Sequence, residues 1–566
     1  MTVAQSYEQI PYDSFPFAQT TPENLFSIAT LFGLDATDFR HARVLELGCA
    51  GGGNLLPLAY SFPQADFIGI DFSNNQISAG QSIQQCLGLN NIRLICESFE
   101  NLAAIKPSLG YFDYIICHGV FSWVSPDVSQ IILKVIKNLL NANGIGFISY
   151  NTLPGWHTPH LIRRTMQLFN PAFNSAFDPT INSTNNSTVN STNNLNNHGE
   201  NTSLALHADG HLKLQMDTLF SDLTTLFGHY ADHFEHSQHP ASQHCHAIQA
   251  ELSALKCKDF TTLFHDHLEQ DNHPIYFTDF NQLLNDNGLQ YIADAEYLKL
   301  CPSMISESVE TIFSKLKYDT EREQLVDIIN NRRFRQSVVC HQDIALSTTL
   351  ESADFNQHFF STELDYASSV SNSQFLDQSE VEFYCNDRRF KSNDPVLKIS
   401  LQQLIRQKGQ PLAKSEWKNA VASYSIPGTS KQAFLSNQHI LYLVLSHFIN
   451  IHGFKGNYTT AIDPAPKISE YARLQARHAN RVTNLRHQSI ILDDIEICLI
   501  GILNGKLTLP EIIEKFKHSL TLNQSSQFSN TIFGKSISKT QLIEQSSEII
   551  DVYLDRLARL ALLEPS

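Results

Sequence analysis

Short apolar runs alternate with segments of helical spacing between residues 43 and 150. The runs RVLEL, ADFIGID, NIRLICE, FDYIICH and GIGFISY predict five strands. Between them lie segments such as NNQISAGQSIQQCLGL and VSQIILKVIKNLLNAN, whose apolar residues recur at helical spacing. This alternation indicates a parallel sheet with crossover helices on both faces. In such sheets ligands bind beyond the carboxyl ends of the strands.

Two later segments extend the strand pattern after a long interruption. QLLNDNGLQYIADAEY (282–297) predicts a helix, an Asn-Gly stop and a strand, and RRFRQSVVCHQ (332–342) predicts a further strand. The helical region from about 206 to 275 is then an insertion. Residues 171–204 are rich in Asn, Ser and Thr and too polar to form a core, so we expect disorder there.

The C-terminal third has the pattern of a mainly helical region. Amphipathic helices alternate with short polar turns in PVLKISLQQLIRQKG (395–409) and LDDIEICLIGILNGKLTLPEIIEKF (492–516). Together with the final SKTQLIEQSSEIIDVYLDRLARLALLEP, the second segment is typical of a winged helix. Its charges are balanced and no basic helix stands out, which favours protein recognition over nucleic-acid binding.

Length, charge and cysteine content narrow the class of protein. A chain of 566 residues is too long for one core, and its net charge of −17 weighs against a nucleic-acid partner. The ten cysteines include no CxxC pair, which favours a reduced, cytoplasmic location. The N-terminus lacks a secretory signal pattern, and no stretch reaches the ~18 apolar residues that a membrane span needs.

The stretch LELGCAGGGN (45–54) directly follows the first predicted strand. It departs from the GxGxxG dinucleotide pattern, because Ala50 takes the third position of the turn. Glu46 adds a carboxylate near the turn, and Asp71 ends the second strand, where an acid can accept hydrogen bonds from both ribose hydroxyls. With no pyrophosphate to hold, the turn can pack against an uncharged or cationic ligand. The alternative is a glycine turn that serves chain geometry alone.

LELGCAGGGN followed by GIDFS resembles the S-adenosylmethionine motifs of class I methyltransferases. The resemblance implies a seven-stranded, Rossmann-like α/β domain with a helical insertion, and S-adenosylmethionine as the cofactor. It places the amino-acid part of the cofactor at the glycine turn, the ribose at Asp71 and the adenine beside Phe72, with Glu97 to Phe99 at the adenine edge. The cofactor contacts predicted in this way are Glu46, Gly48, Ala50, Gly51, Gly53, Asn54, Asp71, Phe72, Gln76, Ser98, Phe99 and Cys117.

Further motifs resemble a narrower group, the bacterial methyltransferases that carry a regulatory domain. These motifs are YDSFPFAQTTPENLFSIATLFG, HGVFSWV, SYNTLPGWH, FHDHLEQDNHPIYFTDF and NGLQYIADAE, in the order of that group. The rickettsial lysine methyltransferases that act on outer-membrane protein belong to it. The resemblance spans roughly residues 7–300. It implies a protein acceptor, such as an outer-membrane or surface protein before its export.

Methyl transfer from a sulfonium requires alignment and exclusion of water rather than a covalent nucleophile. Apolar surroundings favour the neutral lysine amine, and aromatic faces suit cations. The loops CHGVFSWV (117–124) and YNTLPGWH (150–157) supply such groups after strands four and five. The predicted catalytic residues are His118, Trp123, Tyr150 and Trp156, with Tyr12 from a lid that the resemblance implies. The alternatives are aromatic packing, a structural histidine and a bare terminal arm.

A histidine cluster follows the polar segment, at His229, His233, His236, His239, His244 and His246. The first three share one face of a helix that could hold zinc. Such loose spacing is typical of solvated surface, so no metal site is predicted.

The predicted organisation has five parts. They are a methyltransferase core with an N-terminal lid (1–170), a disordered linker (171–205), a regulatory insertion with the closing strands of the core (206–345), a second linker (346–390) and a winged-helix-like recognition region (391–566). The predicted function is S-adenosylmethionine-dependent methylation of protein lysines. The alternatives are methylation of a small molecule and a non-catalytic, cofactor-binding regulatory or scaffold protein. The sequence leaves the acceptor, the number of methyl groups and the oligomeric state open.

Overall fold

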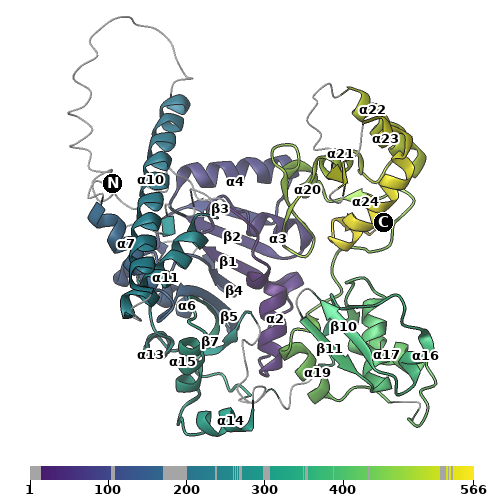
Figure 1. The fold of residues 1–566 in the computed structure, drawn as a ribbon, viewed down its shortest axis with the longest axis horizontal. Helices are drawn as coiled ribbons and strands as arrows, with labels where there is room; N and C mark the ends of the chain where they lie inside the picture. Colours follow the sequence, from purple (N-terminus) through teal and green to yellow (C-terminus); the bar gives the residue numbers. More distant parts are fainter. Residues whose placement is uncertain are drawn as a thin grey trace, which may run out of the picture.

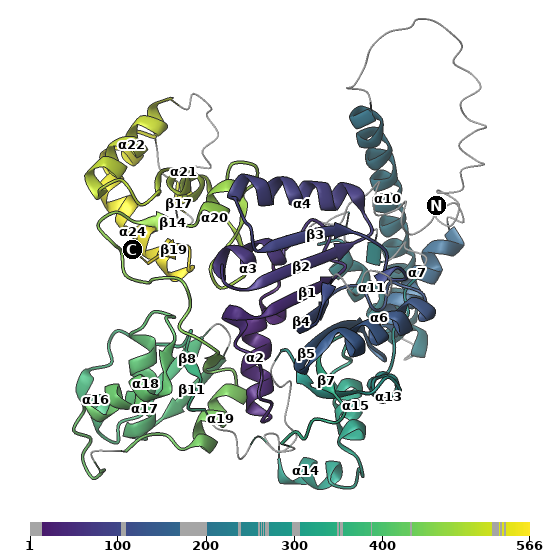
Figure 2. The same cartoon turned by 180° about the vertical axis from the view of Figure 1, so that it is seen from behind.

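The computed structural model describes residues 14–102, 109–169, 201–235, 239–258, 271–296, 306–347, 355–385, 388–430, 433–522 and 539–565, with short stretches between them. A central sheet lies between a helical hairpin on one side and two C-terminal units on the other (Figure 1). The reverse view shows α2 and α3 on the side of the sheet that faces the C-terminal units (Figure 2).

Seven strands form the sheet in the order β3-β2-β1-β4-β5-β7-β6. They are β1 (Arg43–Leu47), β2 (Asp66–Asp71), β3 (Ile92–Cys96), β4 (Phe112–Cys117), β5 (Leu140–Asn151), β6 (Leu289–Asp294) and β7 (Phe334–His341). The first five are parallel to one another, whereas β7 runs antiparallel to both β5 and β6. The predicted seven-stranded α/β fold is therefore confirmed.

Helices cover both faces of this sheet, which is why its strands are nearly continuous apolar runs. One face packs on α2 (Pro22–Leu31), α3 (Leu55–Ser61) and α4 (Asn74–Leu87). The other packs on α6 (Pro126–Leu139) and α13 (Phe277–Asp286). Strand order reverses between β1 and β4, so the carboxyl ends of these two strands diverge around the place where ligands bind in such sheets.

The helical insertion forms a hairpin of α10 (Asn201–Glu235) and α11 (Pro240–Leu255), which packs on α7 (His157–Phe169). The cluster histidines at 229, 233, 239, 244 and 246 are exposed on this hairpin, and His236 lies outside the described residues. Among the residues that the structure describes, no group of three or more His, Cys, Asp or Glu could hold a metal ion. Nowhere among the described residues is a helix long and apolar enough to cross a membrane.

The structure differs from the predicted linker at 346–390. These residues contain β8 (Phe359–Ser361), β9 (Asp365–Tyr366), α16 (Asn372–Leu376) and β10 (Val381–Cys385), followed by β11 (Arg388–Ser392). Phe360, Phe375 and Phe383 are fully buried in one core with Trp417. The apolar positions are too widely spaced in polar sequence to predict these short elements, and the chain from about 355 to 452 forms a unit of its own.

A separate core holds the last hundred residues. It contains α20 (Glu470–Gln475), α21 (Asp494–Ile502), α22 (Leu509–Leu522), α23 (Lys539–Glu544) and α24 (Ser546–Arg559). A two-stranded wing, β15 (Arg481–Thr483) with β16 (Ser489–Ile491), projects from it. The winged-helix-like part is therefore shorter than the region predicted from residue 391.

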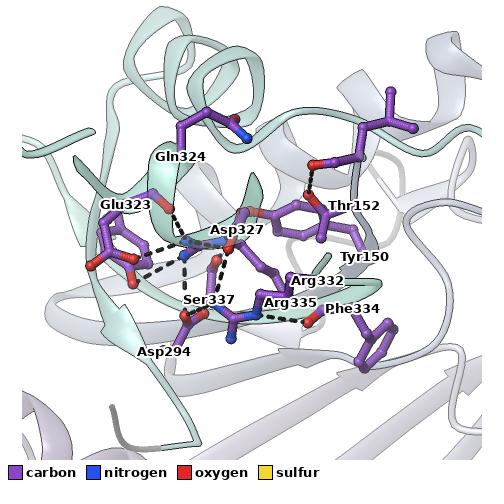
Figure 3. Close-up of polar contacts among 12 residues, drawn as sticks. Tyr150, Thr152, Asp294, Glu323, Gln324, Asp327, Arg332, Phe334, Arg335 and Ser337 are labelled. Atoms are coloured by element: carbon purple, nitrogen blue, oxygen red, sulfur yellow. Dashed lines mark hydrogen bonds and ion pairs between the residues drawn. The ribbon is translucent and has the colours of Figure 1, made fainter. Parts of the chain in front are cut away.

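A buried ion network fastens α15 (Asp319–Ile329) to the edge of the sheet (Figure 3). Arg335 on β7 is fully buried and donates to Asp327 Oδ2 at 2.7 Å, Glu323 Oε2 at 2.8 Å and Asp294 Oδ2 at 3.1 Å. Arg332 donates to Asp294 Oδ2 at 2.6 Å. The guanidinium of Arg335 also lies 3.9 Å from the ring centre of Phe277.

We expect Asp327→Ala to lower the free energy of unfolding by about 3–5 kcal/mol, because a buried guanidinium then loses a carboxylate partner. Urea unfolding followed by far-UV circular dichroism measures this. Asp319→Ala on the same helix is the matched control. The Asp319 side chain is 87% exposed, and its Oδ1 makes only a long surface ion pair of 3.8 Å with a guanidinium nitrogen of Arg322. Its cost should stay below about 1 kcal/mol. Equal losses in the two variants would contradict the role given to the network.

Candidate functional site

The glycine turn that follows β1 adopts backbone conformations that few side chains tolerate. Gly48 and Gly52 have φ angles of +76° and +75°. A Cβ atom at Gly53 would lie 2.2 Å from the carbonyl oxygen of Ser14. The amides of Gly48 and Cys49 donate to the carbonyl of Ile70 on β2, at 2.8 and 3.1 Å, and so fix the turn against the neighbouring strand.

Asp71, at the end of β2, holds this turn from the side. Its Oδ2 accepts from the amide of Ala50 and its Oδ1 from the amide of Ser73, both at 2.9 Å. Each carboxylate oxygen has a second lone pair with which it can accept from a ligand hydroxyl. The next residue, Phe72, is 38% exposed at the same edge of the sheet. The predicted ribose and adenine residues are therefore adjacent to the turn.

The loop after β3 lies beside Asp71. The amide of Glu97 donates to the carbonyl of Asp71 at 2.9 Å. Hydrogen bonds from the Asn101 side chain and from the amide of Ser98 hold the pKa of Glu97 below its usual range. Phe99 packs partly buried on the second face of the sheet. The structure thus places the residues predicted at the adenine edge next to Asp71.

Two other predicted contacts flank the turn. The Gln76 side chain on α4 lies next to the turn, with its Oε1 3.2 Å from a Cβ built at Gly51. Cys117 ends β4 and is fully buried, which raises the pKa of its thiol to about 12. Cys117 is therefore a neutral packing residue at this site.

Glu46 is buried directly beneath the glycine turn. Its Oε1 accepts from Asn54 Nδ2 at 2.8 Å, whereas its Oε2 is buried without a hydrogen-bond partner among the described residues. Burial, with a smaller contribution from the charge of Asp71, raises the pKa of Glu46 to about 8. A buried carboxyl oxygen with no partner suits a ligand that carries an ammonium group, whose positive charge would favour the ionised form of Glu46.

Residues 14–17 cover the glycine turn. Ser14 Oγ accepts from the amide of Gly53 at 2.7 Å, and the amide of Phe17 donates to Asn54 Oδ1 at 3.0 Å. The Phe17 ring lies 4.1 Å from the ring of His118. The segment therefore lies where a lid is predicted, although Tyr12 itself lies outside the described residues.

His118 follows β4 and is surrounded by aromatic rings. Besides Phe17, its ring lies 5.7 Å from Phe147 and 6.0 Å from Phe334. Burial lowers its pKa to about 4, so the imidazole is neutral at physiological pH. Its Nδ1 is buried and has no hydrogen-bond partner within the described part of the chain. This nitrogen can accept a hydrogen bond from an incoming group.

Trp123 and Trp156 meet edge to face, with ring centres 6.0 Å apart. Trp156 is 8% exposed and also contacts His160, whereas Trp123 is only partly buried. The loop that carries Trp156 is tied to the start of β7, because Thr152 and Gly155 donate to the carbonyls of Arg333 and Arg332. The structure thus brings together two aromatic residues predicted from separate loops.

Tyr150 lies in the core and does not face the other predicted catalytic residues. It is 1% exposed and stacks on Phe280 of α13, with ring centres 4.0 Å apart. Its hydroxyl accepts from Ser337 Oγ at 3.4 Å, and burial raises its pKa. These contacts fit a structural role. Successive residues of a strand point to opposite faces, and the aromatic pattern alone did not show which face Tyr150 takes.

Three known domain families match parts of the chain. Residues 38–196 match a methyltransferase domain, residues 259–341 a predicted methyltransferase regulatory domain, and residues 465–562 the C-terminal winged helix domain of PKMT. Uncharacterized protein RP789 of Rickettsia prowazekii is 30% identical over 545 residues, which cover 92% of this chain and 88% of that protein. Uncharacterized protein RP028 of the same organism is 43% identical over 171 residues, or 30% of this chain and 67% of the relative.

A solved structure resembles the whole chain. PKMT2 from Rickettsia typhi, in complex with AdoHcy, superposes with a TM-score of 0.79 at 25% identity. The match covers 98% of this chain and 100% of that one. Its likeness extends through the sheet and both C-terminal units, which supports their arrangement here.

The residues at the turn fit S-adenosylmethionine. The unpartnered Oε2 of Glu46 can accept from the ammonium group, Asp71 from the ribose hydroxyls, and the exposed Phe72 can cover the adenine. Only glycine fits at position 53, because a Cβ atom there would clash with Ser14 of the segment that covers the turn. When bound, this cofactor supplies an electrophilic methyl group on a sulfonium.

We expect Glu46→Gln to remove a pH-dependent loss of stability. The unfolded carboxyl ionises near its ordinary pKa of 4.5, whereas the folded protein keeps the proton up to about pH 8. The wild type should therefore lose about 1.4 kcal/mol per pH unit relative to the variant between these values, and nothing further above them. Urea unfolding of both proteins without cofactor, from pH 5 to pH 9, measures the difference. A difference that is the same at every pH would disprove the raised pKa.

Proposed function

The chain belongs to the family of class I S-adenosylmethionine-dependent methyltransferases with a regulatory domain and a C-terminal winged helix, and from this we propose that it methylates lysine side chains of a protein. The observation that carries the proposal is the neutral, unpartnered His118 nitrogen beside the rings next to the cofactor turn. The winged-helix match to PKMT and the likeness to PKMT2 support a protein acceptor.

The aromatic residues favour an amine acceptor. A lysine enters as an ammonium ion, and its proton must leave before the nitrogen lone pair can attack in line with the sulfonium. Burial among Phe17, Phe147 and Phe334 disfavours the charged form, and the Nδ1 of His118 can accept a hydrogen bond from the amine and so orient it. The segment 14–17 excludes water from the turn.

A cleft of about 410 Å³ supports a large acceptor. It lies where α2 meets residues 361–363, 444–458 and 484–488, so three parts of the chain line it. Among its charged residues are Glu23, Glu296, Glu363 and Arg486. Burial raises the pKa of Glu23 to about 7, so Glu296 and Glu363 are the lasting negative charges beside Arg486. Two carboxylates against one guanidinium suit a cationic, lysine-bearing polypeptide. We further propose that the acceptor is an outer-membrane or surface protein methylated in the cytoplasm before export.

We expect Asp71→Ala to reduce methyl transfer into protein at least ~10-fold, because a carboxylate hydrogen bond is worth roughly 1.5–3 kcal/mol. The measurement is transfer of radiolabelled methyl from S-adenosylmethionine into lysate protein of the native organism. The control is Asp66→Ala, which changes the same strand at its opposite end, where Asp66 pairs with Arg43 and is 42% exposed. Asp66→Ala should keep the wild-type rate.

The chemical form of the labelled product shows which kind of acceptor was methylated. Amino-acid analysis of the labelled band should recover methylated lysine. Label confined to small molecules would refute the protein acceptor, and label on another residue would refute lysine. Cofactor binding without any transfer would favour a regulatory or scaffold role.

A further inference from the structure

We propose that the winged-helix unit completes the cofactor site, with His487 as a positioning residue for the glycine turn. His487 lies in the wing between β15 and β16, and its Nε2 donates to Asn54 Oδ1 at 2.7 Å. Asn54 is the residue that follows the glycine turn and begins α3. The proposal rests on cofactor binding alone and is independent of the identity of the acceptor.

The side-chain amide of Asn54 has every hydrogen-bonding position filled. Its Nδ2 donates to Glu46 Oε1 at 2.8 Å and to Thr20 Oγ1 at 2.9 Å. Its Oδ1 accepts from Nε2 of His487 at 2.7 Å, from the amide of Phe17 at 3.0 Å and, at a longer 3.2 Å, from Thr20 Oγ1. One buried amide therefore joins β1, the covering segment and the wing. An amide with four partner residues is held in one orientation. That orientation fixes the position of the Glu46 carboxyl group.

The backbone of the wing turn fixes the position of His487. The residue has a φ of +58°, in the left-handed region, and is 6% exposed. Asn484 Oδ1 accepts from the amides of Arg486 and Gln488 at 3.0 and 2.8 Å, which closes the tight turn. Burial keeps the imidazole neutral, and since Asn54 Oδ1 can only accept, the proton must lie on Nε2.

A second contact joins the wing to the segment that covers the glycine turn. The guanidinium of Arg481, at the start of β15, lies 4.6 Å from the ring centre of Phe15. Ser14, the residue before Phe15, accepts from the amide of Gly53 in the glycine turn. Residues 14–17 are thus held between the glycine turn and the wing.

Loss of the His487 donor removes the shortest hydrogen bond to Asn54 Oδ1 and leaves the amide held less firmly by Phe17 and Thr20. Glu46 Oε1 and the Phe17 amide then lose their fixed partner. The expected result is weaker cofactor binding, because His487 acts on Glu46 and the covering segment through Asn54. Since His487 also lines the cleft proposed for the acceptor, cofactor affinity is measured without acceptor.

The test compares His487→Met with His487→Gln in the full-length protein. The two side chains are similar in length and make the same demand on the backbone, but only glutamine can donate in place of Nε2. By isothermal titration with S-adenosylhomocysteine, we expect the methionine variant to bind about 10-fold more weakly and the glutamine variant to stay within about 3-fold of wild type. In turnover at saturating acceptor, the KM for S-adenosylmethionine should rise in the methionine variant and return toward the wild-type value in the glutamine variant.

Tyr60→Phe separates this effect from simple loosening of the winged-helix unit. The Tyr60 hydroxyl, on α3, donates to Glu564 Oε1 at 2.8 Å and accepts from the amide of Glu470 at 3.1 Å, so it joins the same two units away from Asn54. Its loss should leave cofactor affinity unchanged. The proposal is overturned if His487→Met binds as wild type does, if Met and Gln weaken binding equally, or if Tyr60→Phe weakens binding as much as His487→Met.

Discussion

The orientation of one buried amide, that of Asn54, governs the arrangement of the cofactor site. Phe17, Thr20, Glu46 and His487 come from three regions of the chain and all hydrogen-bond to it. A buried polar group must have its partners, so these regions have to be in place together. The glycine turn, the segment that covers it and the wing are therefore parts of one site, although they belong to different units of the fold.

A second polar cluster plays the corresponding role at the other edge of the sheet. Arg335 lies between three carboxylates from α15 and β6. Arg332 and Arg333, which directly precede the strand that carries Arg335, supply the carbonyls that anchor the Trp156 loop. Buried ions add little net stability, but they strongly disfavour any other packing of these elements. The region that matches the regulatory domain is thus fixed to the part of the sheet that carries the Trp156 loop.

Much of the catalytic domain could be predicted from the sequence, because strands covered on both faces are apolar runs and crossover helices have a clear period. Asp71 and the glycine turn could be placed because both directly follow strands. Prediction from the sequence was poorer where the hydrophobic pattern does not show to which face a side chain points. Tyr150 occupies a strand end as expected but faces α13, and the short elements between 355 and 392 have too few apolar residues to form a visible period. His487 lies in a polar turn that looks solvated, and its partner is 433 positions away.

The 433 positions between Asn54 and His487 also affect the order in which the parts of the site form during synthesis. At ~5–20 residues per second, the ribosome needs roughly 20 to 90 seconds to reach His487 after Asn54 has been made. A nascent chain can form the sheet and expose its turn during that interval, but the Asn54 amide still lacks its fourth partner. The cofactor site is therefore complete only when the last unit folds, so a nascent chain binds the methyl donor more weakly than the finished protein does.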